Sequence, residues 1–162
     1  MNMNELTQKS QEAILGAQKI AVSHQNQQLE QEHLLLALLR QEGGLVPQLL
    51  RRMGVTVESL EAAVAQEVEK LPGVTGSRDP ERIYVSAALD GALNAAEDAA
   101  SGMRDSYVSV EHLFLGLVET AQGAVKRLLD NYRITREGTL QALQGVRGNQ
   151  RVTTDSPEGT YY

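Results

Sequence analysis

Cysteine and tryptophan are absent from this 162-residue chain, and aromatic residues make up only 4% of it. Without cysteine the chain forms no disulfide framework and offers no thiolate to a zinc ion, which fits a reducing compartment. Because aromatic rings are scarce, the core must be filled by aliphatic side chains, as is common between packed helices. The hydrophobic fraction of 41% is sufficient for such a core.

Two other features are also missing. The formal net charge is −6, whereas nucleic-acid-binding proteins need a basic surface. No apolar run is long enough to cross a bilayer, and the first ten residues, MNMNELTQKS, lack the apolar core of a secretion signal. We therefore expect a cytoplasmic protein that binds neither nucleic acid nor a membrane.

An aliphatic motif occurs twice, as EHLLLALL from Glu32 and as EHLFLGLV from Glu111, 79 residues later. A true repeat should extend beyond its best match. The same offset aligns further hydrophobic and helix-capping positions: Leu6 with Val85, Thr7 with Ser86, Ile14 with Leu93, Ala17 with Ala96, Leu49 with Leu128 and Val55 with Ile134. These pairs indicate a duplicated unit that covers residues 6–70 and 85–146.

Each unit predicts four helices. The first begins at a hydroxyl cap, Thr7 or Ser86, and the second carries the repeated motif, which is apolar almost all round and should be buried. The third helix spans residues 45–53, and the fourth spans 57–69 or, in the second unit, 137–144. We predict an all-α domain with about eight helices and pseudo-two-fold symmetry.

Glycine and proline interrupt the helical pattern twice. Residues 71–83, with two of each, predict a loop between the units. The aliphatic period ends after Gly145. We therefore predict a domain over residues 1–146, followed by an exposed, flexible linker over 147–162.

The chain contains no motif of a known catalytic site. Walker A, H-E-x-x-H and G-x-S-x-G sequences are all missing. We expect a protein-binding domain and not an enzyme, with no catalytic residue, metal or cofactor of its own. His33 and His112 hold equivalent positions after a glutamate, so metal ligation is one alternative. Their duplication favours a structural role, in which each neutral imidazole bonds groups near a helix start.

A groove is expected where the two units meet. Leu89, Ala92, Leu93 and Ala96 lie on the first helix of the second unit and are candidates for its lining. An apolar groove with an acidic rim would accept many unfolded segments, because its contacts are non-directional. The alternative is that these residues belong to the core, which the pairing of Leu93 with Ile14 favours.

The two EHL motifs resemble the N-terminal domain of the Clp chaperone ATPases, the Clp repeat domain, over nearly the whole chain. The LPGV junction at Leu71 and the tail GNQRVTTDSPEGTYY resemble the disaggregase branch of that family. The resemblance implies a hexameric AAA+ parent that works with the DnaK system and binds ATP and magnesium in modules outside this chain. Within it, this chain would be a mobile domain, monomeric in isolation, that binds unfolded or aggregated proteins.

The resemblance also implies site residues. A polar cluster implicated in substrate handling aligns with Thr7, Asp105 and Glu111, and a hydrophobic groove aligns with Leu93 and its neighbours Ala92 and Ala96. Some relatives carry larger apolar residues where this chain has Ala96 and Ala99, which changes the depth and apolar area expected of the groove.

Two alternatives stay open. Thr7 and Glu111 would serve equally well as a helix cap and a first-turn carboxylate. The domain as a whole would instead be regulatory if, as in the ClpC branch, it docks a folded adaptor. Asp105 stands where the first unit has Asn26, and we expect function at this difference between the units.

Overall fold

Eight α-helices account for most of residues 1–74 and 83–160, the part of the chain that the computed structural model describes. They are α1 (Gln8–Ser23), α2 (Gln31–Arg40), α3 (Leu45–Arg52), α4 (Val57–Glu69), α5 (Ala87–Gly102), α6 (Val110–Thr120), α7 (Gly123–Asn131) and α8 (Arg136–Arg147). Two short strands, β1 (Gln28–Leu29) and β2 (Tyr84–Val85), pair in parallel, and 3-10 turns cover Met3–Glu5 and Glu158–Thr160. The predicted all-α class with about eight helices is confirmed.

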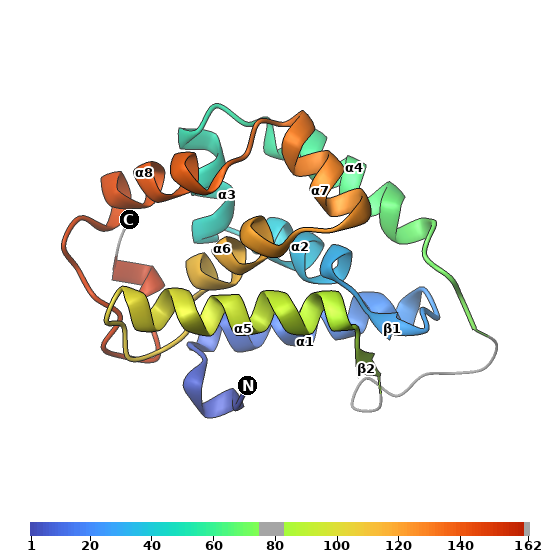
Figure 1. The fold of residues 1–162 in the computed structure, drawn as a ribbon, viewed down its shortest axis with the longest axis horizontal. Coiled ribbons are helices and arrows are strands. Elements are labelled where there is room, and N and C mark those ends of the chain that lie inside the picture. The colour runs from blue at the N-terminus through green and yellow to red at the C-terminus, as the bar shows by residue number, and fades with distance from the viewer. Residues whose placement is uncertain (75–82, 161–162) are drawn as a thin grey trace.

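The two units are intertwined. The central helices α2 and α6 contact each other, and each packs against the first helix of its own unit. The outer helices exchange partners, because α3 packs against α8 and α4 packs against α7. In Figure 1 these four outer helices lie on one side of α2 and α6, while α1 and α5 lie on the other. None of the described helices is long and apolar enough to span a membrane.

The repeated motif supplies the centre of the core. Most of its large side chains are at most 1% exposed, among them Leu34, Leu35, Leu38, Leu113, Phe114 and Leu117, and Leu39 and Leu115 are 4% and 3% exposed. Burying a side chain of this size stabilises a fold by about 1.5–3 kcal/mol relative to leaving it in water. The expectation that the second helix of each unit is central and buried is confirmed.

Hydroxyl caps begin the first helix of each unit, as the sequence predicts. Thr7 Oγ1 accepts a hydrogen bond from the Ser10 N–H at 3.2 Å, and Ser86 Oγ accepts one from the Leu89 N–H at 3.1 Å. Each bond satisfies an amide that has no partner within the helix.

The two helix pairs differ in how closely their backbones approach. On α6, a Cβ atom at Gly116 would lie 2.2 Å from the Ala92 carbonyl oxygen of α5, so this contact requires glycine. The equivalent residue of α2 is Ala37, and there the small partner is Gly16 on α1. A Cβ atom at Gly16 would meet the Ala37 Cβ at 3.5 Å, an ordinary contact. Backbone-to-backbone packing therefore closes the α5–α6 pair near Ala92.

The last helix is longer than the sequence predicts. It passes through Gly145 and ends only at Gly148, which has a φ of 59°. Gly145 lies at a helix contact and not at a turn: a Cβ atom there would lie 2.5 Å from Nη2 of Arg52, the end of an exposed and flexible side chain.

The segment after α8 folds back against the body of the domain. Val152 and Glu158 are 0% and 1% exposed, and Pro157 is also buried. The prediction of an exposed tail is therefore wrong at these residues, because partners on the body bond the segment. Residues 75–82 of the predicted loop and residues 161–162 of the tail lie outside the described residues.

Candidate functional site

The three polar residues expected to cluster do lie in one buried region, at the N-terminal ends of α1 and α6. The members of this polar cluster are Thr7, Asp105, Glu111, His112, Arg147 and Glu158. Their side chains are nearly or fully inaccessible to solvent.

Glu158 links the starts of two helices. Its Oε2 accepts a hydrogen bond from the Thr7 hydroxyl at 2.6 Å and one from the backbone N–H of Val110 at 3.2 Å. Thr7 is the cap of α1, and Val110 is the first residue of α6. The partial positive charge at both helix ends favours a carboxylate at this place.

Asp105 occupies the centre of the polar cluster. Its Oδ2 lies 2.7 Å from Nε2 of His112, and its Oδ1 accepts the Val152 N–H at 2.9 Å and pairs with the guanidinium of Arg147. Burial raises the pKa of Asp105, but the hydrogen bonds from His112, Arg147 and Val152 outweigh it and lower the pKa to about 2. This carboxylate is charged at neutral pH.

Both histidines of the repeat have the structural role that their duplication favours. Nδ1 of His112 accepts the backbone N–H of Ser109, and Nδ1 of His33 accepts that of Glu30, each at 2.9 Å. The proton must then lie on Nε2, which donates to Asp105 in one unit and, at 2.7 Å, to Asn26 in the other. Burial lowers the pKa of His33 to about 4, so this ring is neutral at pH 7.

These contacts leave no ring nitrogen of either histidine for a metal. They also place a serine hydroxyl, a histidine and an aspartate in series, with Ser109 Oγ 2.9 Å from Nδ1 of His112. All three side chains are sealed from solvent, so no substrate reaches them in this conformation. The series acts as a helix cap.

Glu111 is buried with an incomplete set of partners. Its Oε2 lies 3.4 Å from Nη1 of Arg147, whereas its Oε1 has no hydrogen-bond partner among the described residues. The same holds for Oε1 of Glu158. Burial raises the pKa of Glu111. Its charged form is therefore disfavoured in the fold, the opposite of Asp105.

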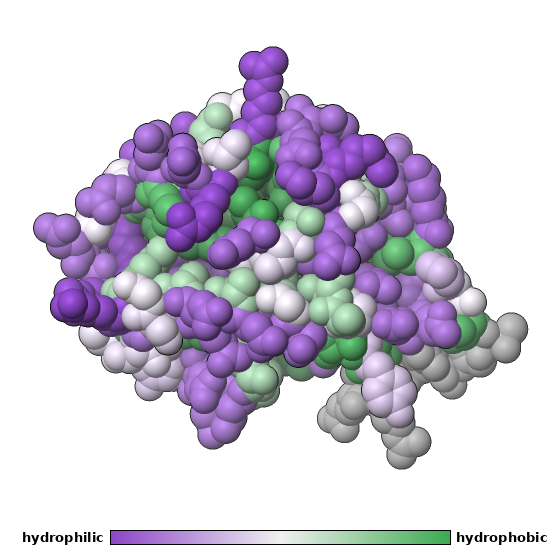
Figure 2. Space-filling view, in the orientation of Figure 1, coloured by the Kyte–Doolittle hydropathy of each residue, from purple (hydrophilic) through white to green (hydrophobic). Residues whose placement is uncertain are grey.

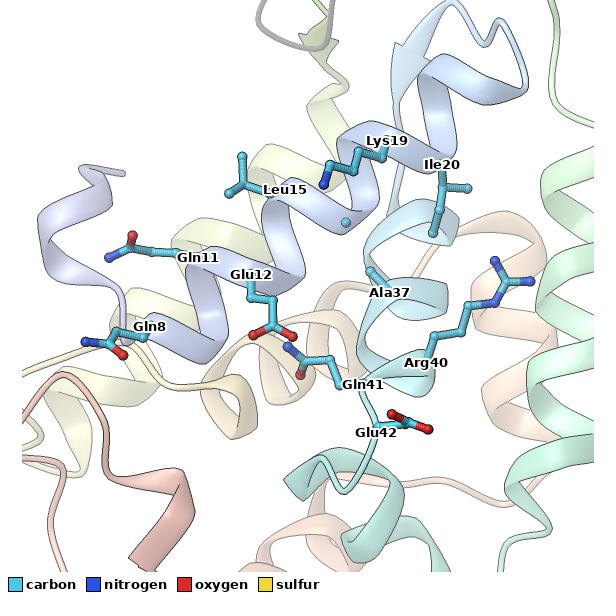
Figure 3. A pocket seen from close by; sticks show the side chains of 11 residues that line it. Gln8, Gln11, Glu12, Leu15, Lys19, Ile20, Ala37, Arg40, Gln41 and Glu42 are labelled. Atoms are coloured by element: carbon cyan, nitrogen blue, oxygen red, sulfur yellow. The ribbon is translucent and has the colours of Figure 1, made fainter.

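A groove of about 960 Å3 lies between α1 and α2, in the first unit (Figure 3). Its apolar lining is Leu15, Gly16, Ile20 and Ala37, and its charged lining is Glu12, Lys19, Arg40 and Glu42. Leu15 is 49% exposed, although it is a large aliphatic residue. Nε2 of Gln41 donates to the Lys9 carbonyl oxygen at 2.9 Å and so ties the end of α2 to α1. The groove is thus an apolar surface with charges of both signs around it.

The groove residues expected in the second unit lie elsewhere. Ala92 and Ala96 are 1% and 0% exposed because the backbone of α6 at Gly116 covers them, and Leu93 is half-buried against the core. Ala92 and Ala96 therefore belong to the contact between α5 and α6 and not to the wall of an open groove. That Leu93 contacts a ligand stays a prediction.

The second unit has a smaller hollow nearer the end of α5. It has a volume of about 310 Å3, is lined by Ala99, Met103 and Leu115, and has Asp98 and Glu119 among its charged residues. Figure 2 shows hydrophobic residues on this face, in the region between α5 and α8, within a largely hydrophilic surface. The larger groove, between α1 and α2, is the better candidate for a binding site.

The duplicated helical units and the histidine cap in each define a helical domain of the kind that Clp chaperones carry at their N-termini. Residues 5–132 match the Clp repeat (R) N-terminal domain, and the chain belongs to this family. Its sequence is similar to the N-terminal region of ClpB proteins.

Curated relatives cover the whole chain. The sequence is 41% identical to the chaperone protein ClpB of Bacillus anthracis over 162 residues, which are 99% of this chain and 19% of that protein. It is 44% identical to ClpB of Nitratidesulfovibrio vulgaris over 163 residues, again 99% of this chain and 19% of that protein. The chain thus spans about a fifth of the length of these relatives.

Solved structures share the fold at lower sequence identity. The Hsp104 N-terminal domain from Candida albicans superposes with a TM-score of 0.83 at 22% identity, over 95% of this chain and 99% of that one. The N-terminal domain of ClpD from Arabidopsis thaliana gives a TM-score of 0.67 at 22% identity, over 91% and 98% of the two chains.

Proposed function

We propose that this domain captures unfolded or aggregated polypeptide, weakly and transiently, in the groove between α1 and α2. The observation that carries the proposal is Leu15, a large aliphatic side chain that is 49% exposed beside a groove of about 960 Å3. The similarity to ClpB supports it, since the curated relatives are named as chaperone proteins.

The lining of the groove suits an extended segment with apolar side chains. Leu15, Ile20 and Ala37 offer non-directional contacts, which discriminate little between one aliphatic partner and another. Glu12 and Lys19 stand beside them, so polar groups of the bound segment have partners of both signs. Such a site should bind many different apolar segments with little selectivity among them.

Weak binding follows from the size of the site. A stable protein–protein contact buries roughly 800 Å2 on each partner, more than a single segment in this groove supplies. If the parent protein assembles as a hexamer, six linked grooves would raise the overall avidity through high local concentration.

Backbone amide shifts test the proposal. A permanently unfolded, non-aggregating protein is titrated into the isotopically labelled domain, and the expected shifts form one contiguous surface around Gln11, Leu15 and Ala37. Shifts confined to the smaller hollow at Ala99 and Leu115 would move the site to the second unit. An unchanged spectrum at millimolar ligand contradicts the proposal.

A further inference from the structure

The segment 152–158, which we call the strap, is bonded to the body along its length. At one end the Val152 N–H donates to Oδ1 of Asp105, and the Ser106 N–H donates to the Val152 carbonyl oxygen at 2.7 Å. At the other end Glu158 accepts the Thr7 hydroxyl. Thr7 and Asp105, two of the three residues that the family resemblance assigns to substrate handling, thus bond the strap.

The middle of the strap touches the wall of the groove. The backbone N–H of Gln8, the first residue of α1, donates to the Asp155 carbonyl oxygen at 2.7 Å. Nε2 of Gln8 also lies 3.2 Å from Oδ2 of Asp155. Gln8 lines the groove together with Gln11 and Glu12 from the same turns of α1.

Helix starts fray unless their free amide groups find partners. The strap supplies one partner directly, through Asp155, and braces the cap residue Thr7 through Glu158. The turns of α1 that form one end of the groove are therefore held in place by the strap. A preformed wall lowers the ordering cost that a ligand would otherwise meet on binding.

We propose that Thr7, Asp105 and Glu111 are positioning residues for polypeptide capture: they hold the strap, and the strap holds the end of the α1–α2 groove, so they need not touch the captured chain. Thr7 acts through Glu158, Asp105 acts through Val152, and Glu111 acts through Arg147, which Asp105 also binds. The inference rests on the groove being the capture site.

Within the described part of the chain, the polar cluster contains two unpaired buried oxygens. Glu111 and Glu158 each keep a buried Oε1 atom that has no hydrogen-bond partner among the described residues. An unpaired buried oxygen costs free energy, so Oε1 of Glu158 offsets part of the contacts that hold the strap.

The test compares four single variants of the chain, and the double variant Glu158→Ala/Thr7→Val, with the wild type. Glu158→Ala removes the anchor but leaves the Thr7 cap intact, whereas Thr7→Val removes the hydroxyl and Thr7→Ser restores it. Thr153→Ala is the matched control, because Thr153 is an exposed residue of the same strap. Heteronuclear NOE values of residues 152–158 report strap mobility, and titration with an apolar peptide that binds the groove reports the Kd.

We expect Glu158→Ala and Thr7→Val to lower the NOE values across the strap and to raise the Kd at least about threefold. The double variant should lose less affinity than the sum of the two single losses, since both changes remove the contact between Thr7 and Glu158. Thr7→Ser and Thr153→Ala should keep wild-type NOE values and a Kd close to that of the wild type.

Three outcomes would overturn the inference, and they are distinguishable. A mobile strap with an unchanged Kd removes the link between strap and groove. Peptide-induced release of the wild-type strap, with shifts at Asp105 and Val110, means that the polar cluster touches the captured chain directly. A wild type that binds no peptide overturns the proposed function and the link together, while the NOE values still decide whether Glu158 anchors the strap.

Discussion

Nε2 of His112 lies 2.7 Å from Oδ2 of Asp105, and the equivalent contact in the first unit joins His33 to Oδ1 of Asn26 at the same distance. One geometry therefore occurs with two electrostatic outcomes. In the second unit the acceptor is a carboxylate that also binds Arg147 and the strap, whereas in the first unit it is a neutral amide. Because Asp105 binds Arg147 and the Val152 N–H, the second unit holds the segment after α8.

Asp105 and Glu111 should respond in opposite ways to loss of charge. Asp105→Asn leaves Arg147 without its closest partner and should lower the free energy of unfolding by about 3 kcal/mol at pH 7. Glu111→Gln should stay within about 1 kcal/mol of the wild type, because burial raises the pKa of Glu111 and its charge is already costly. Urea unfolding of both variants at pH 7 measures the difference.

The stability contributions of Asp105 and Glu111 should depend on pH in opposite directions. The pKa of folded Asp105 is lowered to about 2, so its contribution is complete above the unfolded pKa near 4 and is lost as the pH falls toward 2. Glu111 has a raised pKa, so its neutral form favours the fold at low pH and that contribution fades as the pH rises. Equal losses for the two variants at pH 7 would contradict the assignment.

His33 should make the domain less stable in mild acid. The folded ring has a pKa of about 4 and the unfolded ring one of about 6.5, so the unfolded state binds more protons between these values. This term should lower the free energy of unfolding by about 2 kcal/mol between pH 7 and pH 5. Unfolding curves of His33→Gln should lack it, while His24→Gln, at an exposed position, should retain it. Identical pH profiles for His33→Gln and the wild type would show that the ring is not buried in its neutral form.

Glycine substitutions should distinguish the two faces of the α5–α6 pair. Gly116→Ala puts a Cβ atom 2.2 Å from the Ala92 carbonyl oxygen, and forcing the helices apart should cost about 3 kcal/mol. Gly91→Ala meets no atom within 4 Å on the same helix pair and should stabilise by about 0.5–1 kcal/mol. Thermal unfolding of both variants checks the contrast, and a tolerated Gly116→Ala would contradict the close packing.

The repeat explains how much of the fold the sequence predicts. Thr7 and Ser86 have the hydroxyl that a cap needs, and the EHL motifs are apolar on all sides, so helix starts and buried helices follow from local chemistry. The exchange of partners between α3 and α8 depends on contacts distant in sequence, which periodicity does not reveal. The predicted end of the last helix at Gly145 was wrong, because a glycine at a helix contact and a glycine at a helix end cannot be told apart in the sequence.

The candidate site was harder to predict for the same reason. Thr7, Asp105 and Glu111 lie in one buried region, but their partners are Glu158 for Thr7 and Arg147 for the two carboxylates, and both partners lie in a stretch whose glycines and prolines indicate a loop. Burial of Glu158 depends on two helix starts meeting, which no local pattern records. The groove lies in the first unit, between α1 and α2. We attribute this to Ala37, which occupies on α2 the position that Gly116 has on α6, because one methyl group changes how closely two helices approach.

The central claim is that Leu15 and its groove capture apolar polypeptide, and one affinity comparison tests it most directly. A labelled, unstructured aliphatic peptide is titrated by fluorescence anisotropy into the wild type, Leu15→Glu and Tyr84→Glu, the last a control at another exposed hydrophobic residue, which is 80% exposed. Losing the half-buried leucine contact should raise the Kd of Leu15→Glu about fivefold or more, while Tyr84→Glu should bind as the wild type does. Equal affinities for wild type and Leu15→Glu, or a loss confined to Tyr84→Glu, would contradict the account.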